Sequence, residues 1–168
     1  PKGLVVAGTP IEDVRRALRW DNTWREDDTG PRAWDRMGIA GVRLPKYDKT
    51  LCTGCSGLYS PILMRIMASF RGVPFDEVEI LTGKAMKPSG RARKTVLVGN
   101  CMIKANRRSP DIQEAVWVEG CPPTVESLDD ALIACGFDAE ASAVEQLLHG
   151  VAERYRGKPA FDETFFSS

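Results

Sequence analysis

Histidine is nearly absent from this chain of 168 residues, which contains only His149. One histidine cannot form a metal site of several imidazoles, and no serine or cysteine is identifiable as its companion in a nucleophile–base pair. The sequence also lacks the Gly-Lys-Ser/Thr ending of a phosphate-binding loop. Nucleophilic catalysis and nucleotide hydrolysis therefore have little support, and we interpret His149 as a surface or packing residue.

The chain also lacks an excess of charge of either sign, since basic and acidic residues number 23 each. A neutral balance does not indicate a polyanionic partner, so we expect no nucleic-acid binding. No run approaches the roughly 20 consecutive apolar residues of a membrane span, which excludes direct membrane insertion. The first residues, PKGLVVAGTP, lack the charged start and longer apolar core of a signal peptide, so we expect a cytoplasmic protein.

The length suits one domain, which we place over residues 1–168. Because the chain begins at Pro1 with an apolar run under way, we expect it to be the C-terminal part of a longer polypeptide. Residues 21–50 are polar and interrupted by Gly-Pro and Leu-Pro, and they predict an irregular excursion with one short helix.

Apolar and β-branched runs alternate with helical patterns along the chain. Runs that end in glycine or asparagine predict three strands, within 76–83, 94–100 and 114–120. Capping residues and terminating glycines predict three helices, within 60–72, 124–136 and 138–157, and a further strand and helix are expected within 3–20. Such alternation is typical of an α/β fold with a mainly parallel sheet covered by helices on both faces.

Four of the five cysteines occupy turns near predicted strand or helix ends. They are Cys52, Cys55, Cys101 and Cys121. Loops at the carboxyl ends of parallel strands meet at one edge of the sheet, so we expect these four thiols to converge there. A reducing cytosol argues against a disulfide framework, and four thiolates suit a zinc ion or an iron–sulfur cluster.

The spacing of the four cysteines along the chain helps to choose between a zinc ion and an iron–sulfur cluster. Structural zinc sites usually use two close pairs of ligands, whereas here one close pair, Cys52 and Cys55, is joined by two lone cysteines from separate loops. This arrangement favours a [4Fe-4S] cluster, with a zinc-binding structural or docking module as the alternative. The C-x-x-C pair alone also fits a chance pair or a redox dithiol.

Two motifs carry a family resemblance. TVLVGNCMIKANRR, followed by AVWVEGCPPTVESLDDALIACG, resembles the second half of the 20 kDa iron–sulfur subunit of NADH:quinone oxidoreductase. The chain is more distantly similar to the small subunit of nickel–iron hydrogenases, and it also resembles stand-alone or C-terminal iron–sulfur domains of this type. Cys101 and Cys121 match two cluster ligands of the family, whereas Cys52 and Cys55 are assigned by placement, because the family has adjacent cysteines behind its first strand.

The resemblance implies a flavodoxin-like α/β fold that binds one [4Fe-4S] cluster through four cysteines. It further implies electron transfer to or from a redox partner protein or an upstream domain, and an alternative is a cluster-bearing domain of a larger redox enzyme. Whether the chain is itself an oxidoreductase component stays open at this point.

Other residues have less specific interpretations. The loop over 83–94 contains five basic residues. It predicts either a docking patch for an acidic partner or a phosphate-bearing ligand, or a solvated loop. Arg107 and Arg108 would add to such a patch only if the fold brings the two loops together. We expect Cys135 and Trp117 in the core.

Trp24 and Trp34 lie in the polar excursion. There they would be suited to cover a cluster and exclude water from it.

Overall fold

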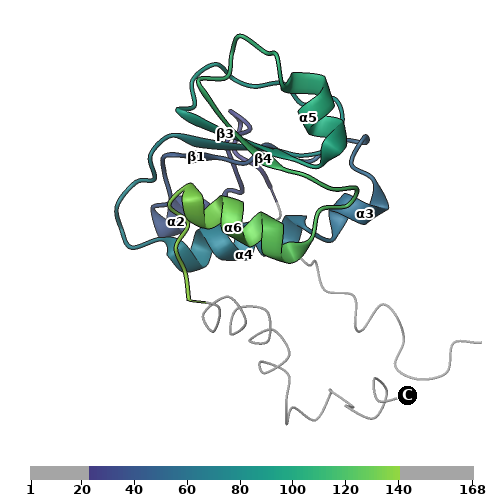
Figure 1. Ribbon diagram of the computed structural model, residues 1–168. Helices are drawn as coiled ribbons and strands as arrows, with labels where there is room; N and C mark the ends of the chain where they lie inside the picture. Colours follow the sequence, from purple (N-terminus) through teal and green to yellow (C-terminus); the bar gives the residue numbers. More distant parts are fainter. Residues whose placement is uncertain (1–22, 141–168) are drawn as a thin grey trace, which may run out of the picture.

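The computed structural model describes residues 23–140, and its centre is a four-stranded parallel sheet (Figure 1). The strands lie in the order β1-β2-β3-β4, and each pairs in parallel with the next. They are β1 (Val42–Arg43), β2 (Val78–Leu81), β3 (Lys94–Val98) and β4 (Glu114–Val118). The strand and helix expected within 3–20, almost all of the helix within 138–157, and His149 lie outside the described residues.

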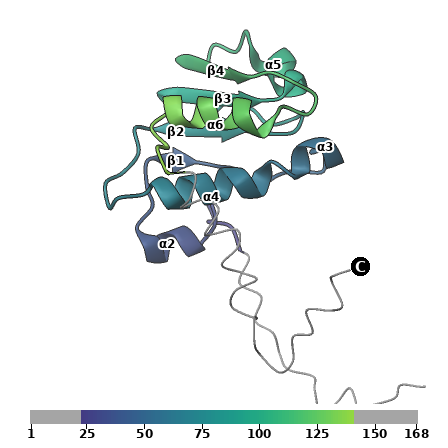
Figure 2. The same cartoon turned by 60° about the horizontal axis from the view of Figure 1, so that its bottom comes forward.

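Helices cover both faces of this sheet (Figures 1 and 2). They are α2 (Ala33–Met37), α3 (Thr53–Ser56), α4 (Tyr59–Ser69), α5 (Asn100–Asn106) and α6 (Val125–Ala134). Helix α5 lies on one face, while α4 and α6 lie on the other. The prediction of an open α/β fold with a parallel sheet is confirmed, and the arrangement is consistent with the flavodoxin-like type.

The strand sequences divide the core between the two faces. Successive side chains of a strand point to opposite sides of the sheet. Val96 and Val98 accordingly join the larger core cluster against α4 and α6, whereas Leu97 between them packs with Met102 of α5. A strand with apolar residues at almost every position is therefore buried on both faces, as β3 is.

The helix boundaries follow local capping chemistry. Thr124 precedes α6 with an extended backbone, and its side-chain oxygen accepts a hydrogen bond from the Ser127 amide at 3.2 Å, as predicted for a helix N-cap. Helices α4 and α6 are joined by Arg65, which is buried and donates from Nε to Asp129 Oδ1 at 3.2 Å. Among residues 23–140, no helix is long and apolar enough to cross a bilayer.

The polar excursion and the segment directly after it hold more regular structure than their sequence indicates. The expected short helix is present as α2, but the two-residue strand β1 and the four-residue helix α3 were not predicted. Both are too short to show a hydrophobic period, and β1 forms because its backbone pairs with β2.

Trp117 is not a core residue, so that prediction is wrong. It lies in β4, which pairs only with β3 among the described strands, and its exposed fraction is 51%. Leu97, its partner across the ladder, is fully buried. An edge strand can have the composition of a central one, because its position in the sheet depends on the other strands.

We predict that truncation of the smaller side chain, Leu97, destabilises the protein more than truncation of the larger one, Trp117. Leu97→Ala should lower the free energy of unfolding by about 2–5 kcal/mol, because it leaves a cavity in a closed core. Trp117→Ala should lower it by less than about 1 kcal/mol, because the ring is half exposed. Urea unfolding of both variants checks this order, and a greater loss for Trp117→Ala would show that β4 is covered in solution.

Candidate functional site

The structure brings the four predicted cysteines to a single pocket. Cys52 directly precedes α3, Cys55 lies within it, Cys101 lies in the first turn of α5, and Cys121 follows β4. All four line this pocket, which we call the cysteine pocket; its other lining residues are Thr50, Gly83, Lys84, Val98, Gly99, Asn100 and Gly120. It lies at the carboxyl ends of the strands, where the topology rule places ligand sites.

The turns that follow β3 and β4 hold each other in place. The Gly99 amide donates to the Val118 carbonyl at 2.8 Å, and the Asn100 amide donates to the Gly120 carbonyl at 3.0 Å. In return, the Gly120 amide donates to the Asn100 side-chain oxygen at 2.9 Å. These bonds fix the backbone next to Cys101 and Cys121, so the separation of these two residues is set by the sheet.

Glycine is needed at Gly120 for two reasons. Its φ of +131° is rarely open to other residues, and an added Cβ would lie 2.6 Å from the Pro123 Cα. The turn can therefore fold back over Pro122 and Pro123 only with glycine at this position, and this fold determines where Cys121 points. The same close packing brings Pro122 to Gly54 of α3, where an added Cβ would be 3.5 Å from the proline ring.

Cys55 occupies the centre of the group. A Cβ placed on Gly99 would lie 3.7 Å from the Cys55 sulfur, so this thiol is close to the turn before Cys101. Burial is the main cause that raises the pKa of Cys55 to about 11, and the neighbouring thiols of Cys52, Cys121 and Cys101 contribute to the same shift. A like charge at each of these sulfurs disfavours a thiolate at Cys55, which places it within electrostatic reach of all three.

Cys52 has the opposite character. The backbone N–H of Cys55 is the main cause that lowers the pKa of Cys52, and the Cys55 thiol, the Gly54 N–H and the Lys84 ammonium group add to this effect. The thiol is exposed. It is therefore the cysteine of this pair best able to form a thiolate at neutral pH.

Lys84 reaches the pocket through a chain of hydrogen bonds that the sequence did not reveal. The Thr50 amide donates to Asp48 Oδ1 at 2.7 Å, and the Lys84 amide donates to Thr50 Oγ1 at 2.9 Å. These bonds tie the loop after β2 to the segment before Cys52. A usable signal was present, because Lys84 follows a predicted strand and so belongs at the same carboxyl edge.

The other basic residues of the 83–94 loop are divided between different surfaces. Lys87 lines a separate hollow together with Lys104, Arg107 and Arg108. The Asn106 side chain holds that loop against α5, since its Nδ2 donates to the Met86 carbonyl at 3.1 Å. The fold thus does bring Arg107 and Arg108 beside the basic loop.

Neither tryptophan of the excursion lines the cysteine pocket. Trp34 is buried in the main core, and Trp24 donates from Nε1 to the Leu44 carbonyl at 3.0 Å. The expectation that they cover a cluster is therefore not supported. Cys135, by contrast, is buried in the same core as predicted, and burial raises its pKa.

The four thiols share a pocket but are not gathered at one point. Among residues 23–140, no three cysteine, histidine, aspartate or glutamate side chains form a group that could hold a metal ion. Thiolate ligands of one zinc ion each lie about 2.3 Å from the metal, so a zinc site would require these sulfurs to move closer together.

Comparison of the chain with protein-family models, curated proteins and solved structures finds no match. A function for this pocket must therefore follow from its own chemistry, which consists of four thiols, three glycine-containing turns and one lysine.

We predict that the metal-free, reduced protein alkylates Cys52 before Cys55. The thiolate is the reactive form, and it is favoured at Cys52 but disfavoured at Cys55 until the pH nears 11. Timed treatment with iodoacetamide at neutral pH, followed by peptide mass spectrometry, measures the order. Equal rates at Cys52 and Cys55 would contradict the assigned asymmetry.

Proposed function

We propose that Cys52, Cys55, Cys101 and Cys121 bind one [4Fe-4S] cluster, and that the protein transfers single electrons to or from a redox partner. The observation that carries this proposal is that all four cysteines line one pocket although they come from three separate segments of the chain. Four thiolates are the usual donor set of such a cluster. When bound, the cluster would supply a one-electron redox centre.

The pocket chemistry fits this group in two respects. Gly83, Gly99 and Gly120 line it, so backbone can approach closely without side-chain interference. Three of the thiols are exposed and can be reached by iron and sulfide during assembly. The pocket encloses about 20 Å³, about the space of one water molecule, so the turns that carry the cysteines would have to move apart to admit a cluster.

The residues of this chain would hold the cluster and adjust its potential. Cys52 readily supplies a thiolate, and Cys55 supplies one only when iron displaces its proton. Lys84 is the cation among the pocket-lining residues. Its charge would favour the reduced, more negative state of the site.

The alternatives differ in what the thiols bind. A zinc-binding docking module needs the sulfurs nearer to each other than they are, because one ion must touch all of them. An iron–sulfur cluster is larger and distributes its thiolates over several irons, which agrees better with ligands spread around a pocket. A cluster-bearing domain of a larger redox enzyme would use the same four residues.

We place the protein in the cytoplasm, where a reducing environment keeps thiols free for metal binding. An acidic surface on the partner would complement the hollow lined by Lys87, Lys104, Arg107 and Arg108. That hollow is on the loop and helix that adjoin the cysteine pocket, so docking there would bring the partner close to the cluster.

We predict that anaerobically purified protein contains about four irons and four sulfides per chain, with broad absorption that bleaches on dithionite addition. Cys121→Ser should lose or convert the cluster, because it removes one of the four thiolates. Cys135→Ala is the matched control, since this fifth cysteine is buried in the core away from the pocket. Iron, sulfide and zinc analysis with absorption spectra compares the three proteins.

Other results of the metal analysis would support other roles for the four cysteines. Full iron and sulfide content in Cys121→Ser would remove this residue from the ligand set. One zinc and no sulfide in the wild type would favour the structural module. A protein without metal that forms a Cys52–Cys55 disulfide would favour a redox dithiol, since each of these two thiols shifts the pKa of the other.

We further predict that Lys84→Gln lowers the reduction potential of the cluster by roughly 10–40 mV, the value for loss of one exposed charge interaction in a one-electron couple. Lys87→Gln removes the same charge from the same loop, but Lys87 lines the other hollow and should have a smaller effect. Redox titration followed by absorbance measures both variants. An equal shift in both would mean that the effect comes from net charge rather than from a pocket residue.

A further inference from the structure

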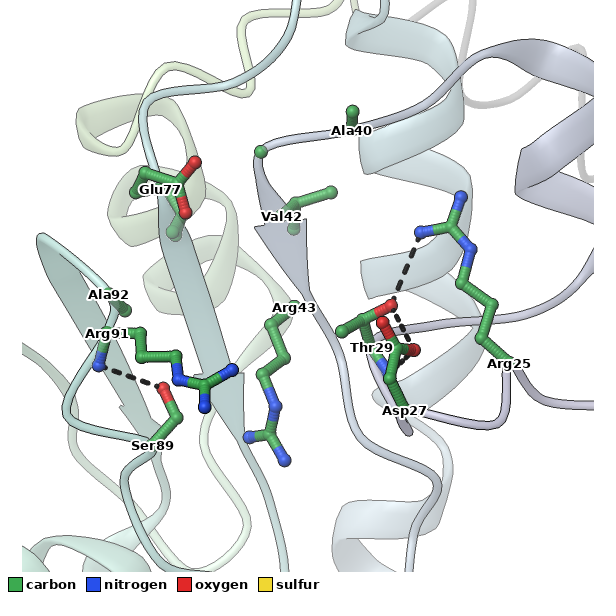
Figure 3. A pocket seen from close by; sticks show the side chains of 12 residues that line it. Arg25, Asp27, Thr29, Ala40, Val42, Arg43, Glu77, Ser89, Arg91 and Ala92 are labelled. Atoms are coloured by element: carbon green, nitrogen blue, oxygen red, sulfur yellow. Dashed lines mark hydrogen bonds between the residues drawn. The ribbon is translucent and has the colours of Figure 1, made fainter.

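A second pocket, of about 540 Å³, lies at the amino ends of β1 and β2, away from the cysteines (Figure 3). It is formed where residues 41–43, at β1, and residues 77–78, at β2, meet the loop before β3. A volume of this size accommodates a small organic ligand. Helix α5 packs against β3 and does not line the pocket, whose remaining wall comes from Arg25, Asp27 and Thr29.

Two arginines from different segments face this space. Arg43 belongs to β1 and Arg91 to the loop between β2 and β3, and the Arg91 side chain extends toward Arg43 in Figure 3. Arg25 also lines the pocket beyond β1, but it is already engaged by Asp35 at 2.8 Å and by the Ile39 carbonyl at 2.9 Å.

A single buried carboxylate organises the pair. The side chain of Glu79 is fully buried, and it accepts an ion-pair hydrogen bond from Arg43 Nη1. The same carboxylate accepts from the Ser89 amide, at 3.0 and 3.2 Å to its two oxygens. Glu79 thus fixes the Arg43 guanidinium, and it also fixes the loop backbone two residues before Arg91, so the Arg43 cation is positioned before any ligand arrives.

The donors left over are suited to an oxyanion. A guanidinium has five N–H groups, and Arg43 uses Nη1 on Glu79. Arg91 makes no side-chain ion pair with any residue in the range 23–140, whereas Arg93, two residues further on, pairs with Asp76 at 2.6 Å. The planar fork of arginine matches the paired oxygens of phosphate and carboxylate groups.

Glu77 limits the ligand class further. It lines the same pocket, is exposed, and has a φ of +49°, a conformation that is uncommon for a residue other than glycine. Its carboxylate would repel a second negative charge nearby but would accept hydrogen bonds from hydroxyl or amino groups. A ligand with one oxyanion group and neighbouring donors satisfies both ends of the pocket.

We propose that this pocket binds a small organic molecule through a phosphate or carboxylate group held between Arg43 and Arg91. The binding site is independent of the cysteine pocket, because the two lie at opposite ends of the strands. Cluster content should therefore not affect it.

The test is calorimetric titration of the full chain at constant ionic strength, with glycerol phosphate and glycerate as probes that share a hydroxylated carbon chain. We expect wild type to bind at least one probe, and Arg91→Gln to weaken that binding by tenfold or more. Arg43→Lys keeps the charge beside Glu79 but loses the planar fork, and it should also weaken binding.

Arg93→Gln is the matched control. It removes the same charge as Arg91→Gln, and Arg93 lies two residues further along the chain, but the Arg93 side chain does not line the pocket. It should alter affinity by less than twofold. Preference for glycerol phosphate would assign the site to phosphates, and preference for glycerate would assign it to carboxylates. Absence of binding of both probes at millimolar concentration, or equal weakening by Arg93→Gln, would overturn the proposal.

Discussion

The reciprocal hydrogen bonds between Asn100 and Gly120 are the constraint on which the cysteine pocket depends. They join the turn after β3 to the turn after β4, and each turn carries a cysteine directly behind the bonded residue. Parallel pairing of the two strands sets the register, so the turns cannot move apart without breaking the ladder. The pocket is therefore rigid on one side, and helix α3 adds the other two thiols to a fixed frame.

At the other end of the sheet, the buried carboxylate of Glu79 holds the neighbouring segments in place. A fully buried carboxylate is costly unless its partners compensate it, and Glu79 has both a guanidinium and a backbone amide. Removal of the Arg43 side chain would leave this buried charge without its counter-ion, and the Ser89 amide bond holds the loop before β3 close to β2. The same loop supplies Lys84 to one pocket and Arg91 to the other.

The parts of this molecule that depend on local pattern could be predicted from its sequence. Runs such as KTVLV are apolar at almost every position and predict a strand, and Thr124 before an apolar helical pattern predicts a helix start. The prediction for Trp117 failed because edge and central strands can have the same composition, and only the pairing separates them. The strand β1 could not be seen because two residues show no period.

The same distinction holds for the candidate site. The turn positions of Cys52, Cys55, Cys101 and Cys121 marked them as candidate ligands, and the topology rule for parallel sheets indicated where they would lie. The contributions of Lys84 and Asn100 depend on contacts with residues distant in the chain, such as the bond from Lys84 to Thr50, which is 34 residues away. Such contacts follow from the packed fold, and no local pattern contains them.

Native mass spectrometry of the intact, anaerobically purified chain tests the cluster assignment most directly. We expect one dominant species whose added mass equals four irons and four sulfides, and loss of that mass on acidification, as the sulfides leave as hydrogen sulfide and the irons as free ions. A dominant species that carries a single zinc ion, or a bare chain in every preparation, would contradict the assignment of the cysteine pocket to an iron–sulfur cluster.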